Sequence, residues 1–252
     1  MKKKTHYILL ALLITIGGIT IAYNKGHISL SGGNTVSIIT PEEGTDVYID
    51  DRKVGESTES NDTIKRNVVD GLHTIIVARE GTWPWSKEVE ITGSTTFSPF
   101  LLPVRVEWDR ITLVSPQYAE IAPLVKNTPA PTASSPLQSP NNTVSVWIEG
   151  TEIMAQWIGI DDAAPTYFCE NSCTGPRSIL SSAKPVHNLF FFKDRNDILV
   201  FSIDDGVYAI ELDTRGTQNF QPIFSGRSVR FYKQDADRMY VLDEEKLYRV
   251  DI

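Results

Sequence analysis

The residues from Tyr7 to Tyr23 form an uncharged, mostly apolar run that is separated from Lys2, Lys3 and Lys4 by two residues. As a helix that rises about 1.5 Å per residue, the run spans about 25 Å, which is close to the hydrocarbon thickness of a bilayer. A charged side chain at mid-bilayer costs about 3 kcal/mol, so a run without charges is suited to that environment. The run therefore predicts a transmembrane helix with Tyr7 and Tyr23 as the interfacial aromatic residues at its two ends.

The three lysines also predict the orientation of this helix, because basic residues stay on the cytoplasmic side. We expect a single-pass membrane protein whose N-terminus is cytoplasmic and whose C-terminal bulk is extracytoplasmic. The same residues also fit a cleaved secretory signal, with Thr20-Ile21-Ala22 as a poor cleavage site. The uncleaved anchor is favoured because the run is long for the apolar part of a signal. A buried core helix is a weaker third alternative, because Gly17-Gly18 disfavours a helix in water.

The charge of the exported part limits its partners. Lys2, Lys3, Lys4 and Lys25 are the only charged residues before Glu42, so 20 of the 24 basic residues remain against 32 acidic ones, a net charge of about −12. Nucleic acid and anionic lipid surfaces both require basic patches. We therefore expect no nucleic-acid partner, and acidity is interpreted first as a means of solubility.

The chain has two cysteines, Cys169 and Cys173, in the segment F-C-E-N-S-C-T-G-P. A close pair outside the cytoplasm usually forms a disulfide, which here would restrain one turn. Free thiols are the main alternative. A metal or redox site is disfavoured, because no further Cys or His lies nearby and the spacing is not Cys-x-x-Cys.

The pattern after the apolar run predicts an all-β ectodomain. Short runs of alternating β-branched and aromatic residues recur between Gly, Pro, Asn and Asp, and no convincing amphipathic helix is present, although Tyr118 to Val125 fits one helical turn. The stretch Asn127 to Asn142 is rich in proline, which disfavours both helix and ladder. It is interpreted as a boundary between two β modules, or alternatively as a loop inserted in one domain. The expected segments are residues 1–26 (cytoplasmic tip and anchor), 27–103 (first β domain), 104–143 (connector and linker) and 144–252 (repeat domain).

Residues Ile28 to Pro103 carry a series of motifs in a characteristic order. These are Thr40-Pro41-Glu42-Glu43-Gly44-Thr45, Val47-Tyr48-Ile49-Asp50, Lys53-Val54-Gly55, Gly71-Leu72-His73, and Gly81 before Trp83. In this order they resemble the PEGA domain, a small β-sandwich-like module of bacterial envelope proteins. The resemblance implies a scaffold or adhesion-like module without a common catalytic site. The chain departs from the family pattern at the extra Glu of the P-E-E-G turn, at Thr45, and at Asp51, where Gly is usual.

Among the aromatic clusters of the sequence, we expect that of Trp83 and Trp85 to be the most exposed. Two indoles on a hairpin could stack on sugar rings or pack against a protein partner. The favoured alternative is that Trp83 is a core aromatic of the module and that Trp85 covers an edge. His73 is interpreted as a residue at the start of a strand, not as a ligand of a metal.

The C-terminal part contains a repeat with an offset of 40 residues. Phe191-Phe192-Lys193 recurs as Phe231-Tyr232-Lys233, and Val207-Tyr208 recurs as Leu247-Tyr248. The repeat resembles the blades of a β-propeller, in which about 40 residues form a four-stranded sheet. Only two and a half such blades are visible, so an incomplete or open set of antiparallel sheets is expected. Blades that are hidden in Phe100–Val125 and paired across chains, and a shortened gene, are the alternatives.

The sequence shows no catalytic constellation, because G-x-S-x-G, a Walker loop and H-E-x-x-H are all missing. No catalytic residue, cofactor or metal is therefore expected. The leading hypothesis is a non-enzymatic, membrane-anchored envelope protein that acts as a scaffold or binds protein or glycan. The alternatives are a structural subunit that self-associates and an envelope hydrolase.

Overall fold

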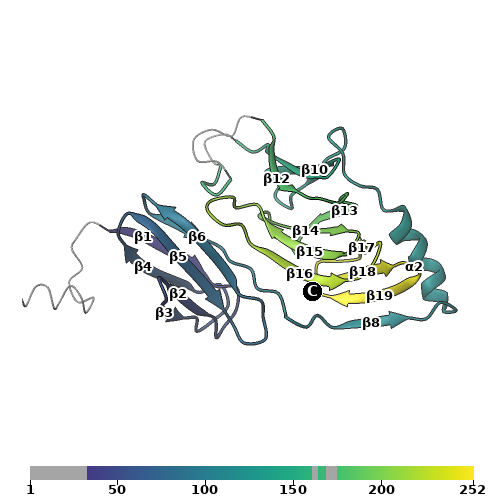
Figure 1. The fold of residues 1–252 in the computed structure, drawn as a ribbon, viewed down its shortest axis with the longest axis horizontal. Helices are drawn as coiled ribbons and strands as arrows, with labels where there is room; N and C mark the ends of the chain where they lie inside the picture. The colour runs from purple at the N-terminus through teal and green to yellow at the C-terminus, as the bar shows by residue number, and fades with distance from the viewer. Residues whose placement is uncertain (1–32, 161–163, 169–174) are drawn as a thin grey trace, which may run out of the picture.

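The computed structural model describes residues 33–160, 164–168 and 175–252, and these residues form an all-β protein with one short helix (Figure 1). No helix among them combines the length and the hydrophobicity needed to cross a membrane. The predicted transmembrane run from Tyr7 to Tyr23 lies outside the described residues, as do Cys169 and Cys173.

The strands β1 to β7 form what we call the first module, which consists of two sheets. One sheet has the order β4-β1-β7 and contains β1 (Asn34–Ile39), β4 (Thr63–Val68) and β7 (Thr95–Phe97). The other has the order β3-β2-β5-β6 and contains β2 (Asp46–Ile49), β3 (Arg52–Glu56), β5 (Gly71–Ala78) and β6 (Trp85–Ile91). Because side chains alternate along a strand, Val36 and Ile38 of the first sheet share a buried core with Val47 and Ile75 of the second. The predicted β-sandwich-like arrangement of this module is confirmed.

A two-residue turn of Asp50 and Asp51 connects β2 to β3. Both residues have positive φ angles, 50° and 63°, as the tight hairpin turn requires. The Asp50 carboxylate stabilises the turn, since it accepts a hydrogen bond from the backbone N–H of Thr74 at 3.1 Å and contacts Nδ1 of His73 at 2.7 Å. Nε2 of His73 lies 2.8 Å from the backbone carbonyl oxygen of Val69. The predicted role of His73 at the start of a strand therefore agrees with its place in β5.

We expect the stability of the protein to fall as the pH rises above about 6.5, because of His73. Burial lowers the pKa of His73, but the Val69 carbonyl and the Asp50 carboxylate outweigh it, so the pKa is raised. A raised histidine pKa contributes stability that is complete below the unfolded pKa of about 6.5 and is lost as the pH passes the folded value. Urea unfolding of the wild type and of His73→Gln between pH 5.5 and 8.5 measures this contribution. An equal slope of unfolding free energy against pH in both proteins would contradict it.

The strands β8 to β19 and the helix form the second module, which consists of three four-stranded antiparallel sheets (Figure 1). The first has the order β12-β11-β10-β9 and contains β9 (Leu137–Gln138), β10 (Val144–Glu149), β11 (Glu152–Trp157) and β12 (Arg177–Ser181). The second contains, in order, β13 (Asn188–Phe191), β14 (Ile198–Ile203), β15 (Gly206–Glu211) and β16 (Phe220–Ser225). The third has the order β17-β18-β19-β8 and contains β8 (Trp108–Ile111), β17 (Arg230–Lys233), β18 (Arg238–Asp243) and β19 (Lys246–Asp251).

The repeat of 40 residues corresponds to two equivalent hairpins. In the β14–β15 hairpin Ile198 pairs with Glu211, and in the β18–β19 hairpin Arg238 pairs with Asp251, so strands and register are both displaced by 40 residues. None of the sheets among the described residues closes on itself. The open antiparallel arrangement therefore agrees with the prediction, while a propeller is not confirmed.

The segment predicted as a connector contributes more structure than expected. β8 pairs with β19 of the same chain and completes the third sheet, and β9 pairs with β10. The helix α2 (Pro116–Asn127) is longer than the single turn that the sequence indicated. It begins after Ser115, whose hydroxyl accepts a hydrogen bond from the backbone N–H of Tyr118 at 3.1 Å, and it packs on the third sheet through Val125 and Ile121. The pattern hid this helix because Pro123 interrupts it and few of its residues are buried.

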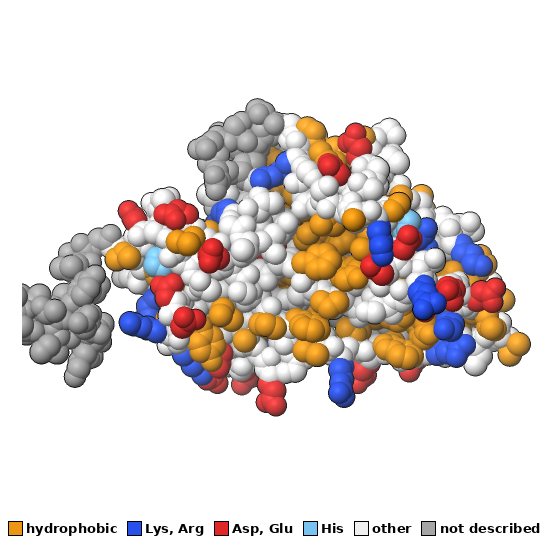
Figure 2. Space-filling model, in the orientation of Figure 1, with side chains coloured by type: hydrophobic (Ala, Val, Ile, Leu, Met, Phe, Trp, Pro, Cys, Tyr) orange, Lys and Arg blue, Asp and Glu red, His pale blue; other side chains and the backbone are white. Residues whose placement is uncertain are grey.

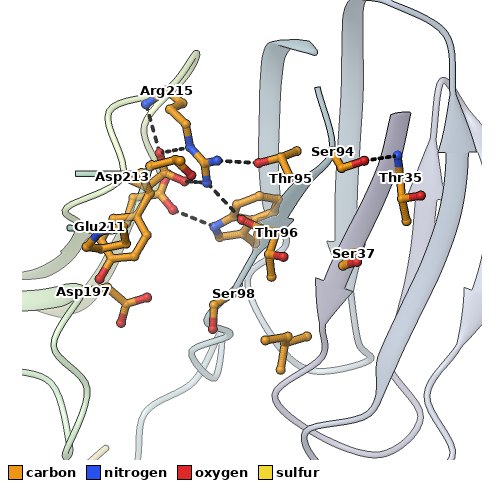
Figure 3. Close-up of a pocket in the computed structure, with 15 residues that line it drawn as sticks. Thr35, Ser37, Ser94, Thr95, Thr96, Ser98, Asp197, Glu211, Asp213 and Arg215 are labelled. Atoms are coloured by element: carbon orange, nitrogen blue, oxygen red, sulfur yellow. Dashed lines mark hydrogen bonds and ion pairs between the residues drawn. The ribbon is translucent and has the colours of Figure 1, made fainter. Parts of the chain in front are cut away.

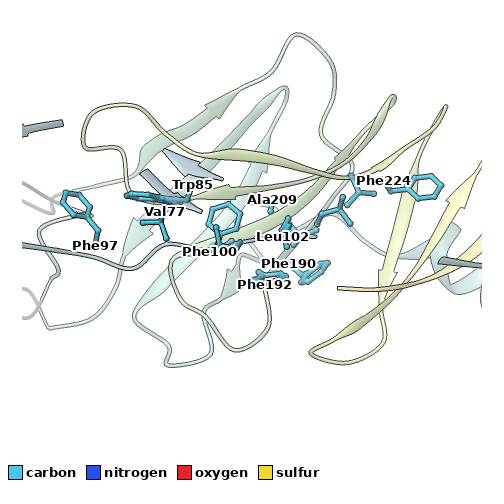
Figure 4. Packing of buried hydrophobic residues seen from close by; sticks show 14 of the residues in the cluster. Val77, Trp85, Phe97, Phe100, Leu102, Phe190, Phe192, Ala209 and Phe224 are labelled. Carbon is cyan, nitrogen blue, oxygen red and sulfur yellow. The ribbon is translucent and has the colours of Figure 1, made fainter. Parts of the chain in front are cut away.

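The two modules share one hydrophobic core. Phe100 and Leu102, in the connection between the modules, lie between Trp85 and Val77 of the first module and the phenylalanines of the second (Figure 4). The side-chain amide of Gln221 holds this connection, because its oxygen accepts from the Leu102 N–H at 3.0 Å. The modules are therefore packed together as one unit and are not joined only by a linker.

Candidate functional site

The edge strand β6 of the first module is covered by the β15–β16 loop of the second. The Asn219 side chain accepts from the Ser86 N–H at 2.9 Å and donates to the Ser86 carbonyl at 3.0 Å. The Thr217 hydroxyl accepts from the Glu88 N–H at 2.8 Å, and the Thr217 N–H donates to the Glu88 carbonyl at 3.0 Å. Unpaired edge groups normally invite pairing with other chains, and here the loop satisfies them.

Lys87 is the buried centre of this contact between the modules. Its ammonium is fully buried, lies 2.7 Å from a carboxylate oxygen of Glu211, and donates to the carbonyl oxygens of Asp213, Arg215 and Thr217 at 2.9–3.1 Å. The Glu211 carboxylate also accepts from the indole N–H of Trp85 at 2.9 Å. Burial raises the pKa of Glu211, and Lys87 and the other donors oppose that shift. All groups that face the carboxylate are donors, so we assign Glu211 as ionised in this pair.

Gly216 allows the loop to approach β6 closely. Its φ angle is 60°, and a Cβ atom placed on it would lie 1.9 Å from the carbonyl oxygen of Glu88. Because that neighbour is backbone, it cannot move aside as a flexible side chain would. Glycine is therefore required at this position by both the backbone angle and the close approach.

A cavity of about 510 Å³ lies beside this contact, and we call it the seam pocket (Figure 3). One wall comes from the first module, from β1, β7, the residues just before and after β7, and Trp85 of β6. The opposite wall comes from the second module. The lining residues are Thr35, Ser37, Ile39, Trp85, Ser94, Thr95, Thr96, Ser98, Pro165, Thr166, Tyr167, Asp197, Glu211, Asp213 and Arg215. The size is in the range of small-molecule sites.

Each carboxylate in the seam pocket already has a cationic partner. Asp197 pairs with Arg195 at 2.6 Å, and Asp213 pairs with Arg215 at 2.7 Å. The third carboxylate is that of Glu211, which pairs with Lys87. The charges of the wall are therefore balanced within the protein.

The wall from the first module carries hydroxyl groups. Arg215 donates to the Thr95 hydroxyl at 2.6 Å, which ties this wall to the second module. Among the described residues, none forms a hydrogen bond with the hydroxyl of Ser37 or with that of Thr96. Figure 3 shows both side chains on the strands that face the opposite wall. On that wall, burial raises the pKa of the Tyr167 phenol, which keeps it protonated as a donor.

The structure places the two tryptophans of the possible binding surface in different environments. Trp85 is only 1% exposed and packs against Phe97 and Lys87, so it does not offer an open stacking face. Side chains alternate along β6, so Trp85 lies on the buried face of this strand while Ser86 lies on the exposed face. This position places Trp85 between the two modules. Trp83 is half-buried against the shared core. A role of Trp83 in binding stays a prediction.

Lys87 and Glu211 were not among the site residues predicted from the sequence. A detectable signal was present in β6, because Trp85, Lys87, Val89 and Ile91 alternate on one face and Lys87 is the only charged member. A lysine at a core-facing position normally has a buried partner. The identity of that partner was not readable, since it lies 124 positions further along the chain.

The surface carries a second feature, an aromatic pair on the second sheet. Figure 2 shows hydrophobic side chains gathered in the middle of one face, over β14–β16. Tyr208 of β15 and Phe220 of β16 stack with their ring centroids 4.8 Å apart, and Phe220 is 47% exposed.

Among the described residues, no group of three or more His, Cys, Asp or Glu side chains is arranged to hold a metal ion.

The comparisons with known proteins identify the first module. Residues 34–102 match the PEGA domain family, which confirms the resemblance. No curated protein matches the chain. Among solved structures, a protein of unknown function from Bacteroides fragilis NCTC 9343, named there as membrane-associated, shares 10% identity, with 86% of this chain and 93% of that chain covered and a TM-score of 0.23. Similarity at that TM-score does not establish a common fold.

Proposed function

We propose that this chain is a membrane-anchored, extracytoplasmic and non-enzymatic envelope protein that binds a ligand in the seam pocket. The observation that carries the proposal is a cavity whose walls come from two modules that are fixed to each other by a buried ion pair and a shared core. A site between modules that are held in place is pre-organised, which reduces the cost of ligand binding. The PEGA domain and the uncharged run after the lysines support a position in the envelope.

The paired carboxylates support binding over catalysis. A hydrolase that works by general acid and base needs a carboxyl group that can exchange a proton with a substrate. Asp197 and Asp213 each accept two hydrogen bonds from one arginine, and Glu211 is held by Lys87 and Trp85. These groups are suited to fixing the geometry of the walls. The envelope hydrolase is therefore the weaker alternative.

The proposal is tested by capture from envelope extract. The full chain is immobilised and exposed to solubilised envelope material and to an array of glycans, next to the variants Thr96→Trp and Ser178→Trp. Thr96 is exposed and lines the pocket, whereas Ser178 is exposed on β12 and lies outside the lining. We expect a ligand that the wild type and Ser178→Trp retain and Thr96→Trp loses. Equal capture by all three would place binding elsewhere.

A protein partner or a second copy is the other candidate, and the stacked Tyr208 and Phe220 favour it as a contact surface. Aromatic residues that are partly exposed are common at the centres of protein interfaces. Self-association through the outer face of the third sheet is disfavoured, because α2 covers that face. Phe220→Ser with a measurement of mass in solution distinguishes this candidate from the pocket.

A further inference from the structure

We infer that the seam pocket selects an uncharged, hydroxyl-rich ligand of the size of a mono- or disaccharide. This inference rests on the proposed function, since it names the ligand class for the same cavity. It begins from the balance of charge in the wall, where Asp197, Glu211 and Asp213 are each matched by a cation of the same chain.

A charged ligand would have to compete with these pairs. An anion would draw Arg215 away from Asp213, and a cation would draw Asp213 away from Arg215; both changes leave a partly buried charge without its partner. The guanidinium of Arg215 is also fixed by Thr95 and by the ring of Phe97, whose centroid lies 4.6 Å from the guanidinium carbon. The pairs therefore discriminate against ligands of either sign.

The remaining groups suit a neutral polyol. The hydroxyls of Ser37 and Thr96 can each donate and accept, which matches the hydroxyls of a sugar. Ile39, Pro165 and Tyr167 add apolar surface to the same cavity, and a sugar ring presents C–H faces between its hydroxyls. A pocket that is largely apolar with a few placed polar groups is typical of such sites. The cavity volume of about 510 Å³ can hold one or two sugar rings but is too small for a folded protein segment.

The test compares disaccharides of different charge. The purified full chain, kept in a zwitterionic detergent without a sugar headgroup, is titrated with di-N-acetylchitobiose, with the cationic glucosamine disaccharide and with the anionic digalacturonate, and binding is followed by ligand-observed NMR. We expect the neutral disaccharide to bind at least tenfold more tightly than either charged one. The double variant Ser37→Ala/Thr96→Val should weaken binding of the neutral sugar about tenfold, while Ser178→Ala should leave it unchanged.

The outcomes separate the two claims. Tighter binding of a charged disaccharide, or equal affinity of the double variant and the wild type, overturns the inference about ligand class. A ligand captured from envelope extract in the pocket would then leave the proposed function in place. If neither an extract component nor any of the three sugars binds in a way that Thr96→Trp blocks, the proposed function fails together with the inference. A circular dichroism spectrum equal to that of the wild type excludes misfolding of the variants as the cause.

Discussion

Replacement of Lys87 by methionine is expected to lower the free energy of unfolding by about 3–5 kcal/mol, because it leaves the buried Glu211 carboxylate without its cation. Lys87 is fully buried, and its ammonium also satisfies three carbonyl oxygens of the β15–β16 loop. For a chain of this size we expect a melting temperature lower by roughly 6–20 °C. Guanidinium unfolding followed by far-ultraviolet circular dichroism measures the change.

Two further variants establish the cause. Lys53→Met removes an exposed lysine that contacts Asp46 and Glu56, and it should change stability little. In Lys87→Met/Glu211→Gln the uncompensated charge is absent, so part of the lost stability should return. A loss in Lys87→Met as small as that in Lys53→Met would show that the ion pair does not hold the modules together.

Trp85→Ala is expected to cost about 3–5 kcal/mol, since it removes a large aromatic side chain from the shared core and leaves a cavity. Trp85 is 1% exposed, its ring lies 5.9 Å from that of Phe97, and its indole N–H donates to Glu211. Trp85→Phe keeps most of the packing and loses the hydrogen bond, so we expect a smaller loss of about 1.5–3 kcal/mol. Urea unfolding of both variants provides the comparison.

Trp83→Ala is the matched control for Trp85, because it removes the same side chain two residues away. Trp83 is half-buried, and among the described residues its ring stacks on none of the core aromatics, so its loss should be clearly smaller than that of Trp85. Equal losses at the two positions would mean that the contact between the modules carries no special share of the stability.

The strands were the part of the fold that the sequence predicted best. Val36 and Ile38, or Val89 and Ile91, alternate with polar residues, and this period of two depends only on which face is buried. The repeat of 40 residues, which resembled propeller blades in the sequence, corresponds in the structure to two equivalent hairpins. β8 escaped prediction because Trp108 to Ile111 has only one buried residue and is defined by its pairing with β19, which lies far along the chain.

The candidate site was largely unreadable from the sequence. Its hydroxyl wall consists of residues such as Ser37 and Thr96, which in the sequence are ordinary exposed positions of strands. They become a wall only because the second module packs opposite them, and that contact depends on Lys87, Glu211 and Gly216 across more than 120 positions. Long-range pairing of this kind leaves no local periodicity in the sequence. The only indication of the contact between the modules was Lys87, a lysine at a core-facing position of β6.

The close approach of Gly216 to β6 has a consequence for how this polypeptide can be divided. A fragment that ends near Pro103 would expose the backbone groups of Ser86 and Glu88 to solvent. It would also leave the ammonium group of Lys87 on an apolar face without its partners. In such a fragment, the unpaired edge of β6 would tend to pair with a strand of another chain. The first module is thus not an independent domain, because its complete structure includes the β15–β16 loop that covers β6.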